Sequence, residues 1–82
     1  MTLDDELRTV VAKASGLQAG DVDDHDALHD DLGISSLDLI EIYGHFEEKY
    51  DLVITDDEAA PIATLAQMRS LIESKMAAAK VH

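Results

Sequence analysis

One pair of serines in this chain lies between a glycine turn and the start of a helix. Ser35 and Ser36 closely follow Gly33 and precede a long segment with apolar residues at helical spacing. Ser35 suits the N-cap position, because its hydroxyl can accept a hydrogen bond from the backbone N–H of Asp38. Ser36 is then the first helical residue, with its side chain pointing outward from the positive helix end. A phosphate attached there would meet free N–H donors and the favourable end of the helix dipole.

The segment around these serines resembles the attachment motif of the acyl carrier protein family, in which a leucine-glycine turn leads to Asp-Ser-Leu. The matching residues are Leu32-Gly33-Ile34-Ser35-Ser36-Leu37-Asp38. The resemblance continues through 39–42, 46–50, Ile54, 56–59 and 62–65, and so covers most of the chain. It implies that Ser36 carries covalent 4′-phosphopantetheine through a phosphodiester bond. The thiol of that group would hold an acyl chain as a thioester.

The resemblance also implies a site for the acyl chain and a pathway class. Following the family's arrangement, the acyl pocket is expected between the second and third helices and is lined by Phe46, Ile54, Ala59, Ile62 and Met68. The isolated chain looks like the free-standing carriers of fatty-acid or polyketide synthesis. Ser35 stands where the family usually has aspartate, and Gly44 where a bulky apolar residue is common. Both departures hint at a specialised carrier.

The overall composition predicts one small domain. Eighty-two residues form a single domain over 1–82, with one core and little surplus stability. The chain has no cysteine, so any thiol chemistry must come from an attached group. No charged-then-apolar leader opens the chain, and no apolar run approaches membrane-spanning length. We therefore expect a cytoplasmic, monomeric protein that does not associate with a membrane.

Negative charge dominates the sequence and is unevenly distributed. Eighteen acidic residues face six basic ones, which gives a formal charge of −12. Fourteen of the acids lie between Asp21 and Glu58, and Lys49 is the one base in that interval. Nucleic acid is not an expected partner, because binding it needs a basic surface. Basic protein surfaces are better candidates, although acids kept for solubility alone are the alternative.

Apolar periodicity and capping residues predict an all-α fold. Thr2 can cap a helix over residues 3–15, which Gly16 ends. A long acidic loop over 18–34 follows, with room for a short helical turn at 26–29. Helices are then expected over 36–50, over 57–60 before Pro61, and from residue 65 after a capping box at Thr64. The prediction is a four-helix antiparallel bundle with a short third helix. The apolar anchors of the long loop are Leu17, Val22, Leu28 and Leu32.

The helix over 36–50 has one apolar and one acidic face. The core face is expected to contain Leu39, Ile42, Tyr43, Phe46 and Tyr50, with Ile40 at its margin. Leu37 is an apolar residue on the opposite face, beside the attachment serine, which favours a role in docking. Gly44 should cost about 1 kcal/mol relative to alanine, which suggests close approach of a partner or of another helix. The predicted docking residues are Leu37, Asp38, Glu41, Gly44, Glu47, Glu48 and Asp56.

No catalytic or metal-binding constellation is predicted. The acidic loop lacks the glycine and the closing glutamate that a calcium loop needs. His25 and His29 have no third ligand in pattern and are interpreted as solvated. His45 is nine residues from Ser36, so a serine hydrolase is not favoured.

Three hypotheses remain open. The first is a non-enzymatic carrier of acyl or aminoacyl groups. The second is an acidic helical module without a prosthetic group, and the third is a small enzyme. Expected partners of a carrier are a phosphopantetheinyl transferase, synthases and acyl-transfer enzymes with basic docking surfaces.

Overall fold

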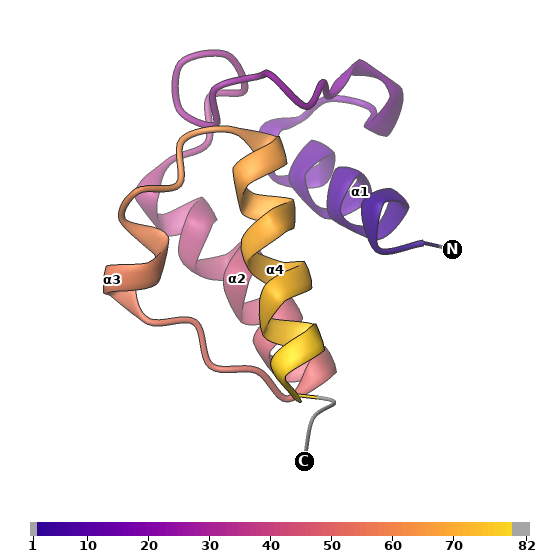
Figure 1. Ribbon diagram of the computed structural model, residues 1–82. Helices are drawn as coiled ribbons and strands as arrows, with labels where there is room; N and C mark the ends of the chain where they lie inside the picture. The colour runs from indigo at the N-terminus through magenta and orange to yellow at the C-terminus, as the bar shows by residue number, and fades with distance from the viewer. Residues whose placement is uncertain (1, 80–82) are drawn as a thin grey trace.

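Within residues 2–79, the chain forms four α-helices and one 3₁₀ turn. The computed structural model describes residues 2–79 and is shown in Figure 1. The elements are α1 (Leu3–Ser15), η1 (Ala19–Asp21), α2 (Ser36–Tyr50), α3 (Asp56–Ala59) and α4 (Leu65–Ala79). Within the described residues no strand forms, and one isolated bridge joins Ala27 to Thr64. The predicted all-α class and the four helices are confirmed, with α3 one residue earlier than expected.

The helix ends follow from capping side chains. The Thr2 hydroxyl accepts a hydrogen bond from the N–H of Asp5 at 3.1 Å, and the Asp5 carboxylate accepts one from the N–H of Thr2 at 3.3 Å. A box of the same kind pairs Thr64 with Gln67 at the start of α4. Gly16 ends α1 in the left-handed region, at φ +77°, where a side chain would be strained. Local sequence therefore sets where these helices begin and end.

The helices do not all alternate in direction. Glu6, in the first turn of α1, contacts Lys49 near the end of α2, so these two helices are antiparallel. By contrast, α2 and α4 run in the same direction, as the colour gradient in Figure 1 shows. The connection through α3 returns the chain to the opposite end of the bundle before α4 begins. The sequence predicts an antiparallel bundle; α1 and α2 are antiparallel, whereas α2 and α4 are parallel.

Apolar side chains from α1, α2, α4 and the long loop form one core. Phe46 and Met68 have no exposed surface, and the predicted loop anchors Val22, Leu28 and Leu32 are buried. Leu17 is largely exposed and does not act as an anchor, whereas Ile34 is buried in its place. The buried apolar set is Leu7, Val11, Ala12, Val22, Leu28, Leu32, Ile34, Ile42, Tyr43, Phe46, Leu52, Leu65, Met68 and Ile72.

Hydrogen bonds fix the long loop to the start of α4. The N–H of Leu28 donates to the carbonyl of Ala63 at 2.9 Å, and the N–H of Leu65 donates to the carbonyl of Asp26 at 3.2 Å. No helix forms at 26–29; a hydrogen-bonded turn follows instead, in which the N–H of Asp31 donates to the carbonyl of Ala27 at 2.9 Å. The one helical turn of the loop is η1, closer to α1. These bonds hold the loop, which precedes α2 in the chain, over the core.

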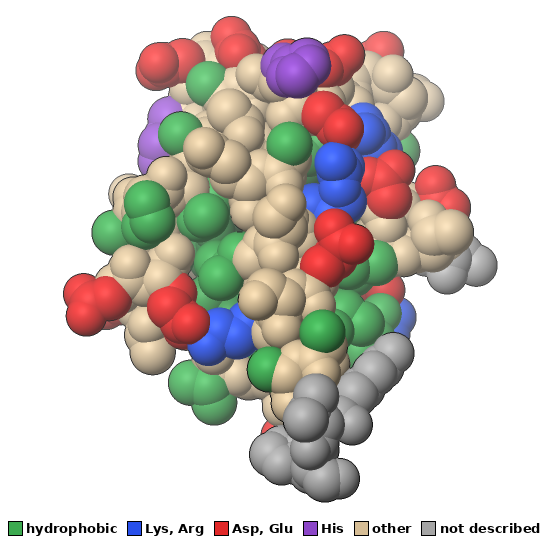
Figure 2. Space-filling model, in the orientation of Figure 1, with side chains coloured by type: hydrophobic (Ala, Val, Ile, Leu, Met, Phe, Trp, Pro, Cys, Tyr) green, Lys and Arg blue, Asp and Glu red, His purple; other side chains and the backbone are tan. Residues whose placement is uncertain are grey.

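Two arginines are enclosed by acidic side chains. Arg69 of α4 binds both carboxylate oxygens of Asp24, at 2.8 and 2.9 Å, and lies 2.7 Å from Asp4. Arg8 of α1 also pairs with Asp4 and Asp24. Figure 2 shows basic side chains in contact with acidic ones on this face. These pairs connect α1, the loop and α4, and they leave little unpaired positive charge on this face of the protein.

Candidate functional site

A tight turn delivers the chain to the start of α2. Gly33 adopts the left-handed conformation at φ +66°, and its N–H donates to the carbonyl of His29 at 3.1 Å. The N–H of Ile34 donates to the carbonyl of Leu28 at 2.9 Å, and the Ile34 side chain is buried. This anchor places the next residue, Ser35, at the helix boundary.

The predicted cap at α2 is present. The Ser35 hydroxyl accepts a hydrogen bond from the N–H of Asp38 at 3.1 Å, and the Asp38 carboxylate accepts one from the N–H of Ser35 at 3.0 Å. Ser36 is the first residue of the helix and is exposed. Its hydroxyl makes no hydrogen bond to any residue within 2–79, nor does its N–H or that of Leu37. The Ser36 oxygen is therefore free for a covalent bond, beside two free donors at the positive end of a helix.

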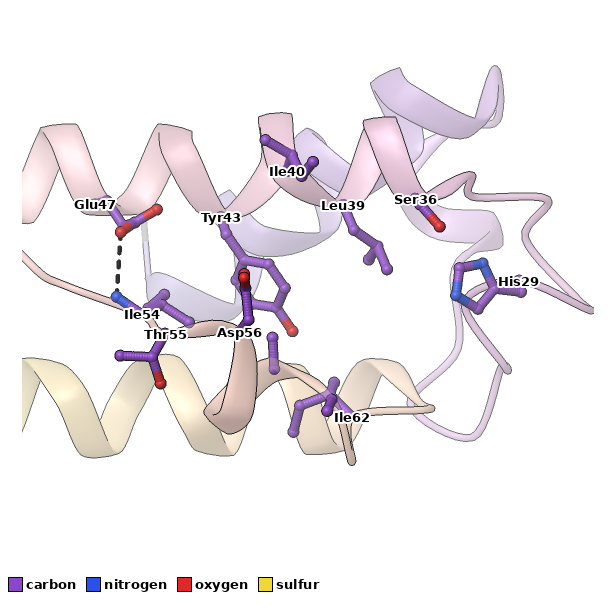
Figure 3. A pocket seen from close by; sticks show the side chains of 12 residues that line it. His29, Ser36, Leu39, Ile40, Tyr43, Glu47, Ile54, Thr55, Asp56 and Ile62 are labelled. Atoms are coloured by element: carbon purple, nitrogen blue, oxygen red, sulfur yellow. Dashed lines mark hydrogen bonds between the residues drawn. The ribbon is translucent and has the colours of Figure 1, made fainter.

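A cavity of about 380 Å³ opens beside Ser36 between α2 and α3. Figure 3 shows Ser36 and His29 at one end of it and Glu47 and Ile54 at the other. Its size lies in the range of small-molecule sites. Apolar residues form most of its wall, and the full lining consists of His29, Ser36, Leu39, Ile40, Tyr43, Glu47, Ile54, Thr55, Asp56, Ala59, Ala60 and Ile62.

The structure brings together part of the predicted acyl pocket. Ile54, Ala59 and Ile62 line the cavity. Phe46 and Met68 do not, because both are completely buried in the core. The Phe46 ring stacks on Tyr50, with centroids 6.0 Å apart, at the end of α2 that meets α1. Their places along the wall are taken by residues that the sequence assigned to the core or its margin, namely Leu39, Ile40 and Tyr43.

Tyr43 is the unusual member of this wall. Its side chain extends from α2 into the space between α2 and α3 (Figure 3), and only 6% of the residue is exposed. The hydroxyl oxygen is buried and has no hydrogen-bond partner within residues 2–79. Burial raises the pKa of this phenol to about 12, so it stays protonated at neutral pH. Helical spacing predicts a core position for Tyr43, but a buried tyrosine hydroxyl also needs a hydrogen-bond partner, which that spacing does not reveal.

Two of the predicted docking carboxylates have internal roles. Asp38 is engaged in the cap of α2. The Glu47 carboxylate accepts a hydrogen bond from the N–H of Ile54 at 3.1 Å, drawn as a dashed line in Figure 3. This bond ties the segment before α3 to α2 and closes the far end of the cavity. Asp56 is exposed at the cavity rim.

The remaining predicted docking residues on α2 lie on its outer face. Leu37 is 65% exposed, and Glu41 and Glu48 are exposed without a hydrogen bond to any residue in the described part of the chain. A Cβ added at Gly44 would meet no other atom within 4 Å. Close packing of another helix of this chain therefore does not explain Gly44. Ile40, expected at the margin of the core, is 68% exposed and extends the apolar surface beside Leu37.

The described residues supply neither a metal site nor an activated nucleophile. No group of three metal-ligating side chains forms within 2–79. His29 lies near Ser36, but its Nδ1 donates to the carbonyl of Ile34, and no hydrogen bond links its ring to the serine. His45 donates to the Glu6 carboxylate at 3.0 Å, away from the cavity. Over the same part of the chain, no helix has the length and apolar character needed to cross a bilayer.

Most of the chain, including Ser36 and the residues around the cavity, is similar to known proteins. Residues 5–72 match the family model of the phosphopantetheine attachment site. The chain is 35% identical over 74 residues to the acyl carrier protein of Sulfurovum sp. (strain NBC37-1), which covers 90% of this chain and 99% of that protein. It is 28% identical over 75 residues to the acyl carrier protein of Chlamydia felis, covering 92% of this chain and 96% of that protein. The acyl carrier protein of Chlamydia caviae is 27% identical over 75 residues, with shares of 92% and 97%.

Proposed function

This chain belongs to the acyl carrier protein family, and we propose that Ser36 is the residue that bears its phosphopantetheine. Acyl carrier proteins are carriers and not enzymes, which agrees with the unactivated serine. Phosphopantetheine supplies a thiol that holds an acyl group as a thioester. The chain has no cysteine of its own for this purpose.

The observation that supports Ser36 over Ser35 is that only the Ser35 hydroxyl takes part in the helix cap. The Ser35 hydroxyl already accepts a hydrogen bond from the N–H of Asp38, and replacing Ser35 with alanine would cost the helix about 1 kcal/mol. The Ser36 hydroxyl is exposed and has no partner within residues 2–79. A phosphate on Ser36 would be stabilised by the free N–H groups of Ser36 and Leu37 and by the helix dipole. The site therefore fits a phosphodiester without rearrangement of the cap.

We propose that the cavity between α2 and α3 receives the acyl chain. It opens at Ser36 and is walled by Leu39, Ile54 and Ile62 among others. Burying an apolar chain there would contribute about 0.8 kcal/mol per CH₂. The predicted pocket residues Phe46 and Met68 lie in the core and are not part of this wall. Chemical-shift changes on acylation should then appear at the cavity residues; changes confined to the loop before Ser35 would contradict this assignment.

We propose that the outer face of α2 docks the partner enzymes. An enzyme that acts on a group at Ser36 must approach this face, where Leu37, Glu41 and Glu48 are exposed. Gly44 would allow close approach, and Asp56 flanks the cavity. Asp38 and Glu47 contribute charge while holding their internal bonds. Partners of this kind are a phosphopantetheinyl transferase, synthases and acyl-transfer enzymes with basic surfaces.

The pathway we propose is fatty-acid or polyketide synthesis, with Ser35 and Gly44 as signs of a specialised carrier. A carrier of aminoacyl groups is the alternative within the family, and capture of partner enzymes by the acylated protein would distinguish the two. The cytoplasmic location and the monomeric state stay predictions, which fractionation and sedimentation would check.

The direct test is the intact mass of the chain after production with a phosphopantetheinyl transferase. A carrier gains the mass of one phosphopantetheine, and fragmentation should place it on Ser36. An unchanged mass, against a relative known to be modified by the same enzyme, would favour an acidic interaction module without a prosthetic group.

A further inference from the structure

The cavity wall contains one buried side-chain oxygen that has no hydrogen-bond partner within residues 2–79. The hydroxyl oxygen of Tyr43 is buried, and no residue within 2–79 accepts its proton. The neighbouring lining residues are apolar, among them Leu39, Ile54 and Ile62. A buried hydroxyl that lacks a partner is unfavourable, because it has lost its hydrogen bonds to water. When such a hydroxyl lies in the wall of a ligand cavity, we expect a ligand atom to accept its hydrogen bond.

No polar side chain of the cavity bonds this hydroxyl: the Asp56 carboxylate is exposed at the rim, and three others are engaged elsewhere. The Glu47 carboxylate accepts from the N–H of Ile54, and the Thr55 hydroxyl donates to Glu58. His29 donates from Nδ1 to the carbonyl of Ile34 at the other end of the cavity. The Tyr43 hydroxyl therefore keeps an unused donor within the wall of the cavity.

Tyr43 lines the cavity, away from the attachment point at Ser36. Tyr43 lies seven residues after Ser36 on α2, about two turns and roughly 10 Å along the helix axis. Leu39 lies between them on the same face of the helix. A group that enters from Ser36 must pass Leu39 before it reaches the hydroxyl. The atom that meets Tyr43 therefore lies inside the cavity, which is the space proposed above to receive the acyl chain.

We propose that this carrier holds an acyl group with an oxygen atom on its chain beyond the thioester, a keto or hydroxyl oxygen that accepts a hydrogen bond from Tyr43. The proposal rests on the attachment at Ser36 proposed above. It names the cargo class as oxygenated acyl chains, in preference to fully saturated ones. Apolar parts of the same chain would pack on Leu39, Ile54 and Ile62.

The test compares two acyl groups of equal length on the same protein. A transferase loads wild type and Tyr43→Phe from coenzyme A derivatives bearing a saturated eight-carbon acyl group or its β-oxo counterpart. Sequestration is measured as protection of the thioester from hydroxylamine. The quantity compared is the protection of the β-oxo chain divided by that of the saturated chain. This ratio should be about five-fold higher in wild type than in Tyr43→Phe, because the variant lacks one hydrogen bond.

Tyr50→Phe is the matched control, because the Tyr50 hydroxyl binds Glu6 and does not line the cavity. It should keep the wild-type ratio. A second readout is the chemical shift of the Tyr43 phenol carbon, which should move in the β-oxo form and stay in place in the holo and saturated forms. A shift already present in the holo form would assign the hydroxyl to the prosthetic arm and overturn the proposal. An equal shift with the saturated chain would assign it to the thioester carbonyl and do the same.

The loading step distinguishes failure of the attachment proposal at Ser36 from failure of the cargo proposal at Tyr43. If no mass is gained, the attachment at Ser36 and this proposal both fail. If mass is gained but the protection ratio is the same in wild type and Tyr43→Phe, only the oxygenated cargo is rejected.

Discussion

The carboxylate of Glu6 on α1 lies 2.8 Å from Nζ of Lys49 on α2. Glu6 is buried, and it also accepts hydrogen bonds from His45, at 3.0 Å, and from the Tyr50 hydroxyl. One carboxylate thus collects three donors from the last two turns of α2. These bonds hold α1 against α2, the helix that begins with Ser36.

Replacing Glu6 should remove part of the acid sensitivity of the protein. Burial raises the pKa of the Glu6 carboxyl, but hydrogen bonds from Lys49, Tyr50 and His45 outweigh it and lower the pKa to about 2. A lowered folded-state pKa stabilises the protein above the ordinary value of 4.5, and this contribution is lost as pH falls toward 2. The loss should reach up to about 3 kcal/mol, at about 1.4 kcal/mol per pKa unit.

Urea unfolding of wild type and Glu6→Gln at neutral pH and near pH 3 measures this effect. The variant should be less stable at neutral pH, and its free energy of unfolding should fall less on acidification. Glu41→Gln serves as control, because Glu41 is exposed and makes no hydrogen bond within residues 2–79. Equal losses on acidification in wild type and Glu6→Gln would show that this carboxylate is not stabilised by its partners.

Removing the Tyr43 hydroxyl should stabilise the unmodified protein. Tyr43→Phe keeps the ring that packs in the cavity wall and deletes a buried oxygen without a partner in the described chain. We expect the free energy of unfolding to rise by about 1 kcal/mol. Tyr50→Phe should have the opposite effect, because the Tyr50 hydroxyl binds Glu6. Chemical denaturation of both variants checks this, and a loss of stability in Tyr43→Phe would mean that the hydroxyl has a partner in solution.

Reversing the charge of Glu41 should slow association with a transferase. Glu41 lies on the outer face of α2, one turn from Leu37. A single exposed charge contributes about 1 kcal/mol or less, so a few-fold lower initial rate is expected for Glu41→Lys at low salt and little difference at high salt. Leu37→Ala should instead shorten the lifetime of the complex. Glu73→Lys on α4 is the charge-matched control; if it slows modification as much as Glu41→Lys, α2 is not the docking face for that enzyme.

Ser35→Asp should restore the acidic neighbour that the family usually has. Aspartate is as good an N-cap as serine, so the fold and the helix boundary should stay unchanged in circular dichroism and thermal unfolding. The added charge should alter recognition by a generic transferase, and we expect faster modification in a time course at low salt. An unchanged rate would show that the acidic neighbour does not govern recognition of this serine.

The helix boundaries could be predicted because their causes are local. Thr2, Ser35 and Thr64 each bond a backbone N–H three residues away, so the sequence alone specifies these caps. Gly16 likewise stops α1 without help from distant residues. The proposal of Ser36 as the attachment serine rests on the same local reasoning, together with the family motif.

The parts of the site that depend on tertiary packing were not predictable in this way. Helical periodicity placed both Phe46 and Tyr43 on the buried face, but it does not say which points toward α1 and which toward α3. The structure directs Phe46 to Tyr50 and leaves Tyr43 in the cavity. The pairing of Glu6 with Lys49 joins residues far apart in the sequence, and no local pattern indicates it.

The attachment of phosphopantetheine to Ser36 is tested most directly by a matched pair of variants, Ser36→Ala and Ser35→Ala, each produced with a phosphopantetheinyl transferase. Intact mass should show one added group on Ser35→Ala, which loses about 1 kcal/mol of helix stability with its cap but keeps the acceptor. Ser36→Ala should show none while giving the wild-type circular dichroism spectrum. Modification that survives Ser36→Ala and is lost in Ser35→Ala would contradict the assignment.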